Sequence, residues 1–180
     1  LTEVVAREDS PADRAEMSDD ELLSLAAAVQ SRSEHHLAEA TVEAARDRSL
    51  ALPSATEFNA VVGKGVHATV DGETIHIGNP RYFETELADR PIEGADEGLA
   101  AVAELETAGK TSVLVARESA EEVVVLGWLA YTDSVRAGVA EMIKQLRENG
   151  VEQIVMLTGD NQRVAEHIAD QVGIDEVYAG

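Results

Sequence analysis

The spacing of apolar residues predicts two helices in the first fifty residues. Behind Ser18-Asp19-Asp20-Glu21, which has the spacing of a capping box, apolar residues follow at helical intervals: Leu22, Leu25, Ala26 and Val29. We expect a helix over residues 19–31 and a second over residues 36–49. The inward stripe of the second helix is expected to be Leu37, Ala40, Thr41 and Ala44. A short strand over residues 1–6 and a polar loop over residues 8–17 should precede them.

The middle of the chain alternates between apolar and polar residues, which is typical of strands. Val66, Ala68 and Val70 alternate with polar residues before Asp71-Gly72, a strong signal for a two-residue hairpin turn. The return strand carries Ile75 and Ile77. In this register Ala68 faces Ile75 and His67 faces His76, so the hairpin should have one apolar and one polar face. A helix over residues 97–107 and strands over residues 111–116 and 123–129 should follow.

The last third of the chain has a different rhythm. A helix is expected over residues 134–149 and ends at Gly150. A buried strand over residues 151–157, a tight loop at 158–160 and a helix over residues 161–172 come next. Helix, buried strand, loop and helix form a parallel α/β pattern. The fold class is therefore α+β: an antiparallel sheet flanked by helices over residues 1–130, followed by a partial α/β domain over residues 131–180.

Charge excludes several classes of partner. The net charge is −21, so nucleic acid and anionic membrane surfaces are poor partners. The only lysines are Lys64, Lys110 and Lys144. A diffuse acidic surface that is poor in lysine resembles proteins from salt-loving organisms; the alternative is an ordinary acidic protein. With no cysteine in the chain, disulfides and thiolate metal sites are excluded. No apolar run approaches the length of a membrane span.

Two segments could contact phosphate or a flat ligand. Thr158-Gly159-Asp160 should lie at the carboxyl end of a parallel strand, where such folds place ligands, and Thr158 could donate to a phosphoryl oxygen. The alternative is a plain helix cap. In Gly63-Lys64-Gly65, two glycines let a ligand approach the backbone, although an ordinary turn has the same pattern. Gly109-Lys110-Thr111 resembles the end of a P-loop. A P-loop also needs a glycine five positions before Gly109, however, and that position is occupied by Glu104.

Histidines offer weaker signals. His35 should start the second helix, where the positive helix end favours a neutral ring that can contact an adenine. An exposed loop histidine is the alternative. His67 and His76 are expected cross-strand neighbours and could pick up zinc or nickel incidentally. Since a third ligand is missing, no designed metal site is expected.

In their order along the chain, these motifs resemble the heavy-metal branch of the P-type ATPases. The matching segments are Ser33-Glu34-His35 with Leu37-Ala38, Gly63-Lys64-Gly65-Val66, Ile77-Gly78-Asn79, Gly109-Lys110-Thr111, Asp133 with Arg136, and Leu157 to Asn161. The resemblance implies a nucleotide-binding domain followed by part of a haloacid dehalogenase-like (HAD-like) phosphorylation domain. It also implies ATP and Mg²⁺ as cofactors, and the membrane and actuator domains of the same pump as partners. The chain would be a cytoplasmic part of an integral membrane protein.

The resemblance also implies roles for single residues. His35, Gly63 and Gly65 would hold adenine, with Glu34 and Asn79 near that pocket. Thr158, Gly159 and Asp160 would bind the phosphate, and Asp133 would lie at the hinge between the two domains. Two positions depart from the family pattern. His36 replaces the usual proline after the signature histidine. Gln30 replaces the usual glutamate five residues before it, although its amide oxygen can still accept from the adenine amino group.

Parts of the family pattern are missing. The motif Asp-Lys-Thr-Gly-Thr, which carries the phosphorylated aspartate, is absent, as is the magnesium-binding segment Gly-Asp-Gly-x-Asn-Asp. We therefore expect a segment of a longer pump that binds nucleotide and does not form the phosphoenzyme alone. The alternatives are a stand-alone nucleotide-binding or regulatory module and a fragment of a HAD-family phosphatase. The sequence does not indicate the transported metal, the direction of transport or the oligomeric state.

Overall fold

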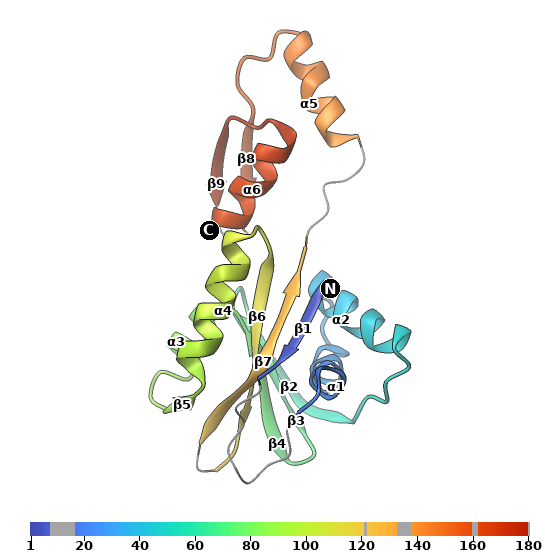
Figure 1. Cartoon of the computed structure of the whole chain (residues 1–180), viewed down its shortest axis with the longest axis vertical. Coiled ribbons are helices and arrows are strands. Elements are labelled where there is room, and N and C mark those ends of the chain that lie inside the picture. The colour runs from blue at the N-terminus through green and yellow to red at the C-terminus, as the bar shows by residue number, and fades with distance from the viewer. Residues whose placement is uncertain (8–16, 121, 133–137, 160–161, 180) are drawn as a thin grey trace. The chain divides into compact units, whose positions relative to one another are not determined.

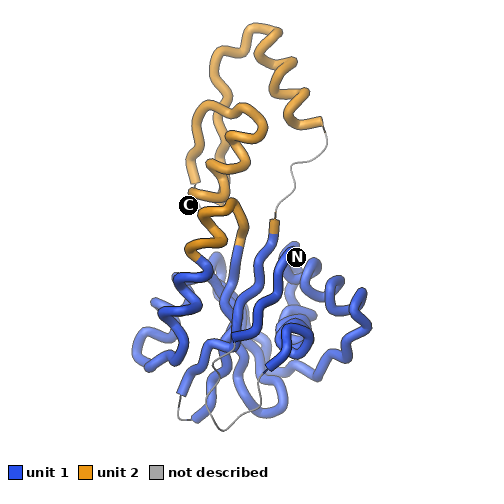
Figure 2. The backbone as a smooth tube through the Cα atoms, in the orientation of Figure 1, with its two compact units in different colours: residues 1–102, 112–131 blue, residues 103–111, 132–180 orange. Residues whose placement is uncertain are grey.

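A computed structural model describes residues 1–7, 17–120, 122–132, 138–159 and 162–179. The described chain divides into two compact units (Figure 2): unit 1 comprises residues 1–102 and 112–131, and unit 2 comprises residues 103–111 and 132–180. None of the described helices is long and apolar enough to span a membrane. The polar loop expected over residues 8–17 lies almost wholly outside the described residues.

Unit 1 is built on a largely antiparallel sheet (Figure 1). Its described strands run in the order β1-β7-β6-β4-β3-β2, and β5 pairs in parallel with β7. The bounds are β1 (Glu3–Ala6), β2 (Ala55–Val61), β3 (Gly65–Val70), β4 (Glu73–Gly78), β5 (Ile92–Glu93), β6 (Thr111–Glu118) and β7 (Val123–Tyr131). This confirms the predicted antiparallel sheet flanked by helices.

Helices cover both faces of this sheet. Helices α1 (Asp19–Gln30) and α2 (His36–Asp47) lie on one side, and α3 (Pro80–Glu86) and α4 (Ala95–Thr107) on the other (Figure 1). The first core contains Leu22 and Leu129, and the second contains Tyr82 and Val102. Because apolar side chains leave water on both sides of the sheet, the hydrophobic effect stabilises both layers.

The start of α1 forms as predicted. The Ser18 hydroxyl accepts from the Glu21 amide at 3.3 Å, and the Glu21 carboxylate accepts from the Ser18 amide at 2.8 Å. These reciprocal bonds pair two amides that the first helical turn would otherwise leave free. They also hold the pKa of the Glu21 carboxyl below its ordinary value.

The predicted inward stripe of α2 was right at Thr41 and displaced by about one residue elsewhere. The buried face consists of Ala38, Thr41, Val42 and Ala45, whereas Leu37, Ala40 and Ala44 are only partly buried. Both stripes have helical spacing, so the pattern alone did not distinguish them.

The β3–β4 hairpin has the predicted register, with Ala68 opposite Ile75 and His67 opposite His76. The expectation of a polar face on this hairpin was only half right, since His76 is 4% exposed. Helix α3 covers this side of the sheet, and Tyr82 packs beside the His76 ring. The elements α3, β2, β5 and β9 were not predicted.

Besides residues 103–111, unit 2 contains α5 (Val139–Glu148), β8 (Val155–Thr158), α6 (Gln162–Val172) and β9 (Glu176–Ala179), with β8 and β9 parallel. The strand predicted from residue 151 starts four residues later. Gly150 has a left-handed φ of 91°, and the Val151 amide still bonds back to the Leu146 carbonyl at 3.1 Å. Val151 therefore belongs to the helix cap rather than to the strand.

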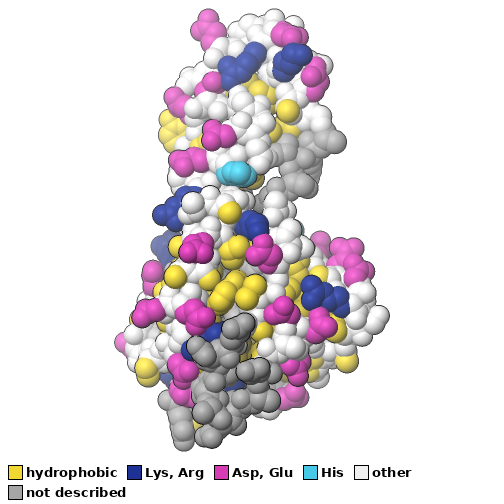
Figure 3. Space-filling view, viewed as in Figure 1, with side chains coloured by type: hydrophobic (Ala, Val, Ile, Leu, Met, Phe, Trp, Pro, Cys, Tyr) yellow, Lys and Arg dark blue, Asp and Glu magenta, His cyan; other side chains and the backbone are white. Residues whose placement is uncertain are grey.

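Acidic side chains are distributed over the molecule. Figure 3 shows Asp and Glu scattered over the visible face rather than gathered in one patch. Several pair with the few cations, as Asp20 does with Arg48 at 2.9 Å and Asp175 with Arg147 at 2.7 Å. The remaining excess of negative charge is therefore solvated and spread out.

Candidate functional site

The turn between β2 and β3 places Gly63 and Gly65 in different environments. Gly63 has a φ of +71°, and a Cβ there would meet no atom within 4 Å. A Cβ on Gly65 would lie 2.3 Å from the Ile77 carbonyl oxygen and 2.6 Å from the Gly78 Cα. Gly65 is thus required by close packing of the strands, whereas Gly63 leaves its surface open. Val62, beside it, is 95% exposed.

Asn79 is hydrogen-bonded to this turn through its side chain and its backbone. Its side-chain amide donates to the Gly63 carbonyl at 3.1 Å, and its backbone amide donates to the Lys64 carbonyl at 2.9 Å. Its side-chain oxygen accepts from the Tyr82 amide at 3.0 Å, which makes Asn79 the N-cap of α3 ahead of Pro80. The polar atoms of the Asn79 side chain are therefore committed to the turn and to the helix.

His35 starts α2, as the sequence predicted. Its Nδ1 accepts from the Leu37 amide at 3.3 Å and so caps the helix. The ring stacks on His36, with centroids 4.3 Å apart and planes inclined by 29°. His36 therefore supports the His35 ring through stacking, where the family pattern has a proline. Glu34 precedes the cap and is exposed.

Gln30 ends α1 and is 6% exposed. Its Oε1 is buried with no hydrogen-bond partner among the described residues. Thr41 and Tyr131 lie in the same buried cluster, their hydroxyl oxygens 2.7 Å apart. Burial raises the pKa of the Tyr131 phenol, and hydrogen bonds with Thr41 and Gln30 oppose that shift. A buried acceptor without a donor carries a free-energy cost, which a donor bonded to Gln30 Oε1 would remove.

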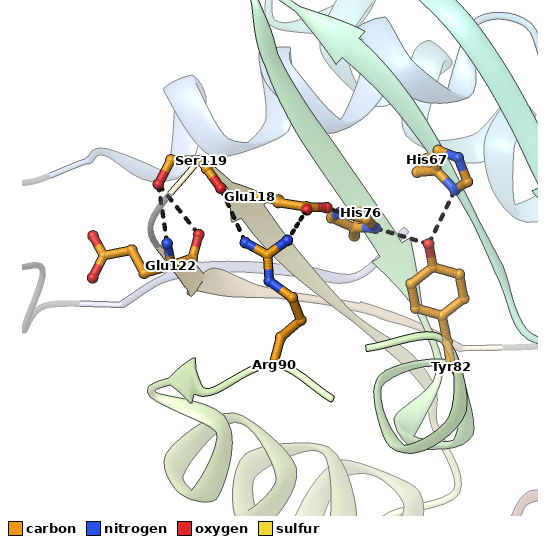
Figure 4. Close-up of polar contacts among 7 residues, drawn as sticks. All are labelled: His67, His76, Tyr82, Arg90, Glu118, Ser119 and Glu122. Atoms are coloured by element: carbon orange, nitrogen blue, oxygen red, sulfur yellow. Dashed lines mark hydrogen bonds and ion pairs between the residues drawn. The ribbon is translucent and has the colours of Figure 1, made fainter. Parts of the chain in front are cut away.

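A polar network under α3 was not predicted (Figure 4). The Tyr82 hydroxyl lies 2.8 Å from His76 Nδ1 and 3.1 Å from His67 Nδ1. On its other side, His76 Nε2 lies 2.8 Å from a Glu118 oxygen, and Arg90 pairs with the same carboxylate. Burial lowers the pKa of His76, and the hydrogen bond to Glu118 opposes this shift. The alternation of the hairpin marked this side as polar but carried no signal of the covering helix.

These residues also line a cavity of about 440 Å³, together with Glu57 and Thr69. In the described ranges, no cluster of three or more potential metal ligands occurs. The polar atoms of His76 and Tyr82 are paired with each other and with Glu118. The network therefore fastens α3 to the sheet.

In unit 2, Thr158 ends β8 and Gly159 follows it at the carboxyl end of the strand. A Cβ on Gly159 would meet no atom within 4 Å, so the backbone there is open. Asp160, the third predicted phosphate-site residue, and Asp133, predicted at the hinge, lie outside the described residues. Gly109-Lys110-Thr111 forms the turn into β6, as expected for a segment that is not a P-loop.

Comparison with known proteins identifies the family. Residues 2–180 match the family model described as haloacid dehalogenase-like hydrolase. The chain belongs to the haloacid dehalogenase-like hydrolases. This HAD-like chain is 41% identical over 160 residues to a probable copper-exporting P-type ATPase V of Mycobacterium tuberculosis (strain CDC 1551 / Oshkosh). The match covers 89% of the chain and 20% of that relative.

Two further relatives point the same way. A silver-exporting P-type ATPase of Salmonella typhimurium is 41% identical over 160 residues, which cover 88% of this HAD-like chain and 18% of the relative. The crystal structure of a zinc-transporting PIB-type ATPase in its E2.Pi state matches at 38% identity with a TM-score of 0.62, covering 98% of this chain and 26% of that one. The chain thus spans about a fifth of the length of the curated relatives, and its homologues are heavy-metal P-type ATPases.

Proposed function

We propose that this chain is the ATP-binding segment of a heavy-metal cation-transporting P-type ATPase and lies on the cytoplasmic side of the membrane. The relatives named above are a probable copper exporter, a silver exporter and a zinc transporter, and the chain aligns with about a fifth to a quarter of their length. ATP and the remainder of the same pump, its membrane and actuator domains, are the proposed partners. The observation that carries the proposal is the buried, unpaired Oε1 of Gln30, five residues before His35.

The proposed base site uses residues of unit 1. The exocyclic amino group of adenine donates to Gln30 Oε1 and so pairs the buried acceptor. The His35 ring, held by its cap bond and by stacking on His36, contacts the base. Gly63 supplies open backbone that a flat ligand can approach, and Asn79 keeps that backbone in place. Guanine presents a carbonyl where adenine has its amino group, so Gln30 should disfavour it.

The proposed phosphate site uses the loop after β8. Thr158 and Gly159, with Asp160, contact the phosphate, and Asp133 acts near the nucleotide. In the parent pump, Mg²⁺ would neutralise phosphate charge. The described residues contain no group of three or more His, Asp or Glu side chains that could hold this ion. Chemistry requires the aspartate of the missing Asp-Lys-Thr-Gly-Thr motif, and the chain alone is therefore expected to bind ATP without forming a phosphoenzyme.

Equilibrium binding of ATP and GTP tests the base site. Gln30→Leu removes the acceptor at similar volume, and ATP affinity should fall about fivefold, the value of one hydrogen bond. Gln30→Glu keeps an acceptor and serves as the matched control, with affinity equal to or above that of the wild type. Equal affinities for ATP and GTP, or unchanged ATP binding by Gln30→Leu, would show that Gln30 does not contact the base.

The reading frame around the chain tests the pump itself. Membrane helices and an upstream Asp-Lys-Thr-Gly-Thr motif are expected in the same gene product. Their absence would favour the stand-alone nucleotide-binding or regulatory module. An Asp-x-Asp nucleophile on an early strand would favour the HAD-family phosphatase.

A further inference from the structure

Lys64 lies within the Gly63–Gly65 turn and is one of three lysines in a chain of net charge −21. A cation at this position suggests a contact with nucleotide phosphate. The structure directs it elsewhere, because Lys64 Nζ donates to Thr85 Oγ1 at 2.9 Å and to a Glu86 carboxylate oxygen at 2.7 Å. The Lys64 side chain is 25% exposed. The hydrogen bond from Lys64 also holds the pKa of the Glu86 carboxyl below its ordinary value.

The helix that receives Lys64 is firmly anchored. Tyr82 is 1% exposed, and its hydroxyl bonds two histidines on neighbouring strands (Figure 4). Thr85 and Glu86 follow three and four residues later, so helical geometry brings them to the same side of α3 as Tyr82. Helix α3 can therefore act as a rigid support for the turn.

The turn itself has little packing of its own. Gly63 has a left-handed φ and no neighbour for a side chain, and Val62 is almost fully exposed. Its described ties are the two Asn79 bonds, the backbone bond from the Lys64 amide to the Val61 carbonyl at 3.0 Å, and the Lys64 side chain. Asn79 fixes the carbonyl side of the turn. The Lys64 side chain ties the middle of the turn to Thr85 and Glu86 of α3.

We propose that Lys64 is a positioning residue, and that its contacts with Thr85 and Glu86 form a latch that holds Gly63 and Gly65 in place for the adenine base. This inference rests on the proposed function, because it assigns the turn to base binding. The latch acts on the base and not on the phosphates. Loss of the latch should therefore lower the affinities for adenosine and for ATP by the same factor.

Binding of adenosine and ATP to the full 180-residue chain separates a latch from a phosphate contact. Lys64→Ala and Glu86→Gln should each lower both affinities about threefold, as expected for the loss of an exposed charged hydrogen bond. Lys64→Arg can still reach Glu86 and should restore most of the affinity. Glu84→Gln, an exposed charge change in the same helix, is the matched control and should leave both affinities unchanged.

The sign of the Glu86→Gln effect is decisive. Removing a negative charge from this acidic chain should strengthen ATP binding if only net charge matters, whereas the latch requires weaker binding. If Lys64→Ala lowered the affinity for ATP but not for adenosine, and Glu86→Gln lowered neither, Lys64 would be a phosphate contact and the proposal would be overturned.

Hydrogen exchange separates failure of the latch from failure of the proposed function. If the wild type bound neither adenosine nor ATP, the proposed function would be wrong, and the latch could still be judged in the free protein. The amide at position 64 should exchange faster in Lys64→Ala and Glu86→Gln than in the wild type, and at the wild-type rate in Glu84→Gln. Unchanged exchange in the first two variants would refute the latch.

Discussion

The two units differ in how completely they cover their own sheets. In unit 1, helices lie on both faces of the sheet, and Leu129 and Val123 of β7 are fully buried. In unit 2, α6 buries Val164, Ala165, Ala169 and Val172, but β8 and β9 leave an open face of Val155, Leu157 and Tyr178. Leu157 is 81% exposed and Tyr178 is 59% exposed. Parallel strands are normally covered on both faces, so unit 1 is expected to be the self-sufficient folding unit.

The largest expected difference comes from one leucine in each unit. Leu129→Ala removes a fully buried side chain and should lower the free energy of unfolding of unit 1 by about 3 kcal/mol. Leu157→Ala on the open face of unit 2 is the matched control and should change stability by less than about 0.5 kcal/mol. Urea unfolding followed by Trp128 fluorescence measures unit 1, and hydrogen exchange of α6 amides measures unit 2. Equal losses of unfolding free energy in the two variants would show that the two units do not differ in how well their sheets are covered.

A pair of tyrosines sharpens the same contrast. Tyr82→Phe removes the hydroxyl that His67 and His76 share and leaves the buried His76 Nδ1 unpaired. We expect unit 1 to lose about 1–2 kcal/mol. Tyr178→Phe removes only an exposed bond to Glu176 and should have almost no effect. A Tyr82→Phe variant as stable as the wild type would show that the network does not fasten α3.

Local signals in the sequence predicted much of unit 1. The capping box at Ser18 and the Asp71-Gly72 turn each determine a register over a few residues, so α1 and the hairpin form as expected. Helix α3 was missed because seven residues are too short for a helical period. Asn79-Pro80 did carry its start signal, a capping residue followed by proline. Strand β2 is interrupted by a bulge between Thr56 and Asn59, which breaks its alternation.

The candidate site was only partly predictable, because local sequence signals determine turns and caps but not which distant elements cover a residue. Motif spacing marked Gly63, Gly65, Asn79 and His35. The bond from Asn79 fixes the turn at Gly63, and separately the cap bond fixes the His35 ring. The burial of Gln30 and His76 depends on which distant elements cover them, and alternation does not carry that information. The roles of the site residues remain predictions, and so do the domain boundary at residue 130 and the halophilic origin.

A smaller effect is expected from the protonation of His76. Burial lowers its pKa below the ordinary 6.5, so the folded state favours the neutral ring. The unfolded chain therefore binds a proton at higher pH than the folded protein does. The stability that the neutral ring contributes is fully present above about pH 6.5 and is lost as the pH falls toward the folded pKa.

The difference in unfolding free energy between the wild type and His76→Gln measures this effect. Unfolding is followed by Trp128 fluorescence from about pH 7.5 to pH 5.5. The extra stability of the wild type over His76→Gln should shrink as the pH falls. An advantage that grows at low pH would mean that His76 is charged against Glu118 and that its pKa is raised.

Added salt should produce the smallest difference in stability between the two units, since acidic residues occur in both. Screening should reduce self-repulsion, and added salt should raise the melting temperature and limit partial unfolding. Calorimetry across a salt series measures this change. A melting temperature that does not depend on salt would contradict the interpretation of the acidic surface as a salt adaptation.

An NMR titration of backbone amides with ATP, and then with GTP, tests the central claim most directly. ATP should shift the amides near Gln30, His35, Gly63 and Gly65 in unit 1, and GTP should shift them much less. His35→Ala should weaken the ATP-induced shifts, whereas His36→Ala, which removes only the stacking partner, should weaken them less. Equal shifts with ATP and GTP, or unchanged ATP binding by His35→Ala, would contradict the proposed adenine site.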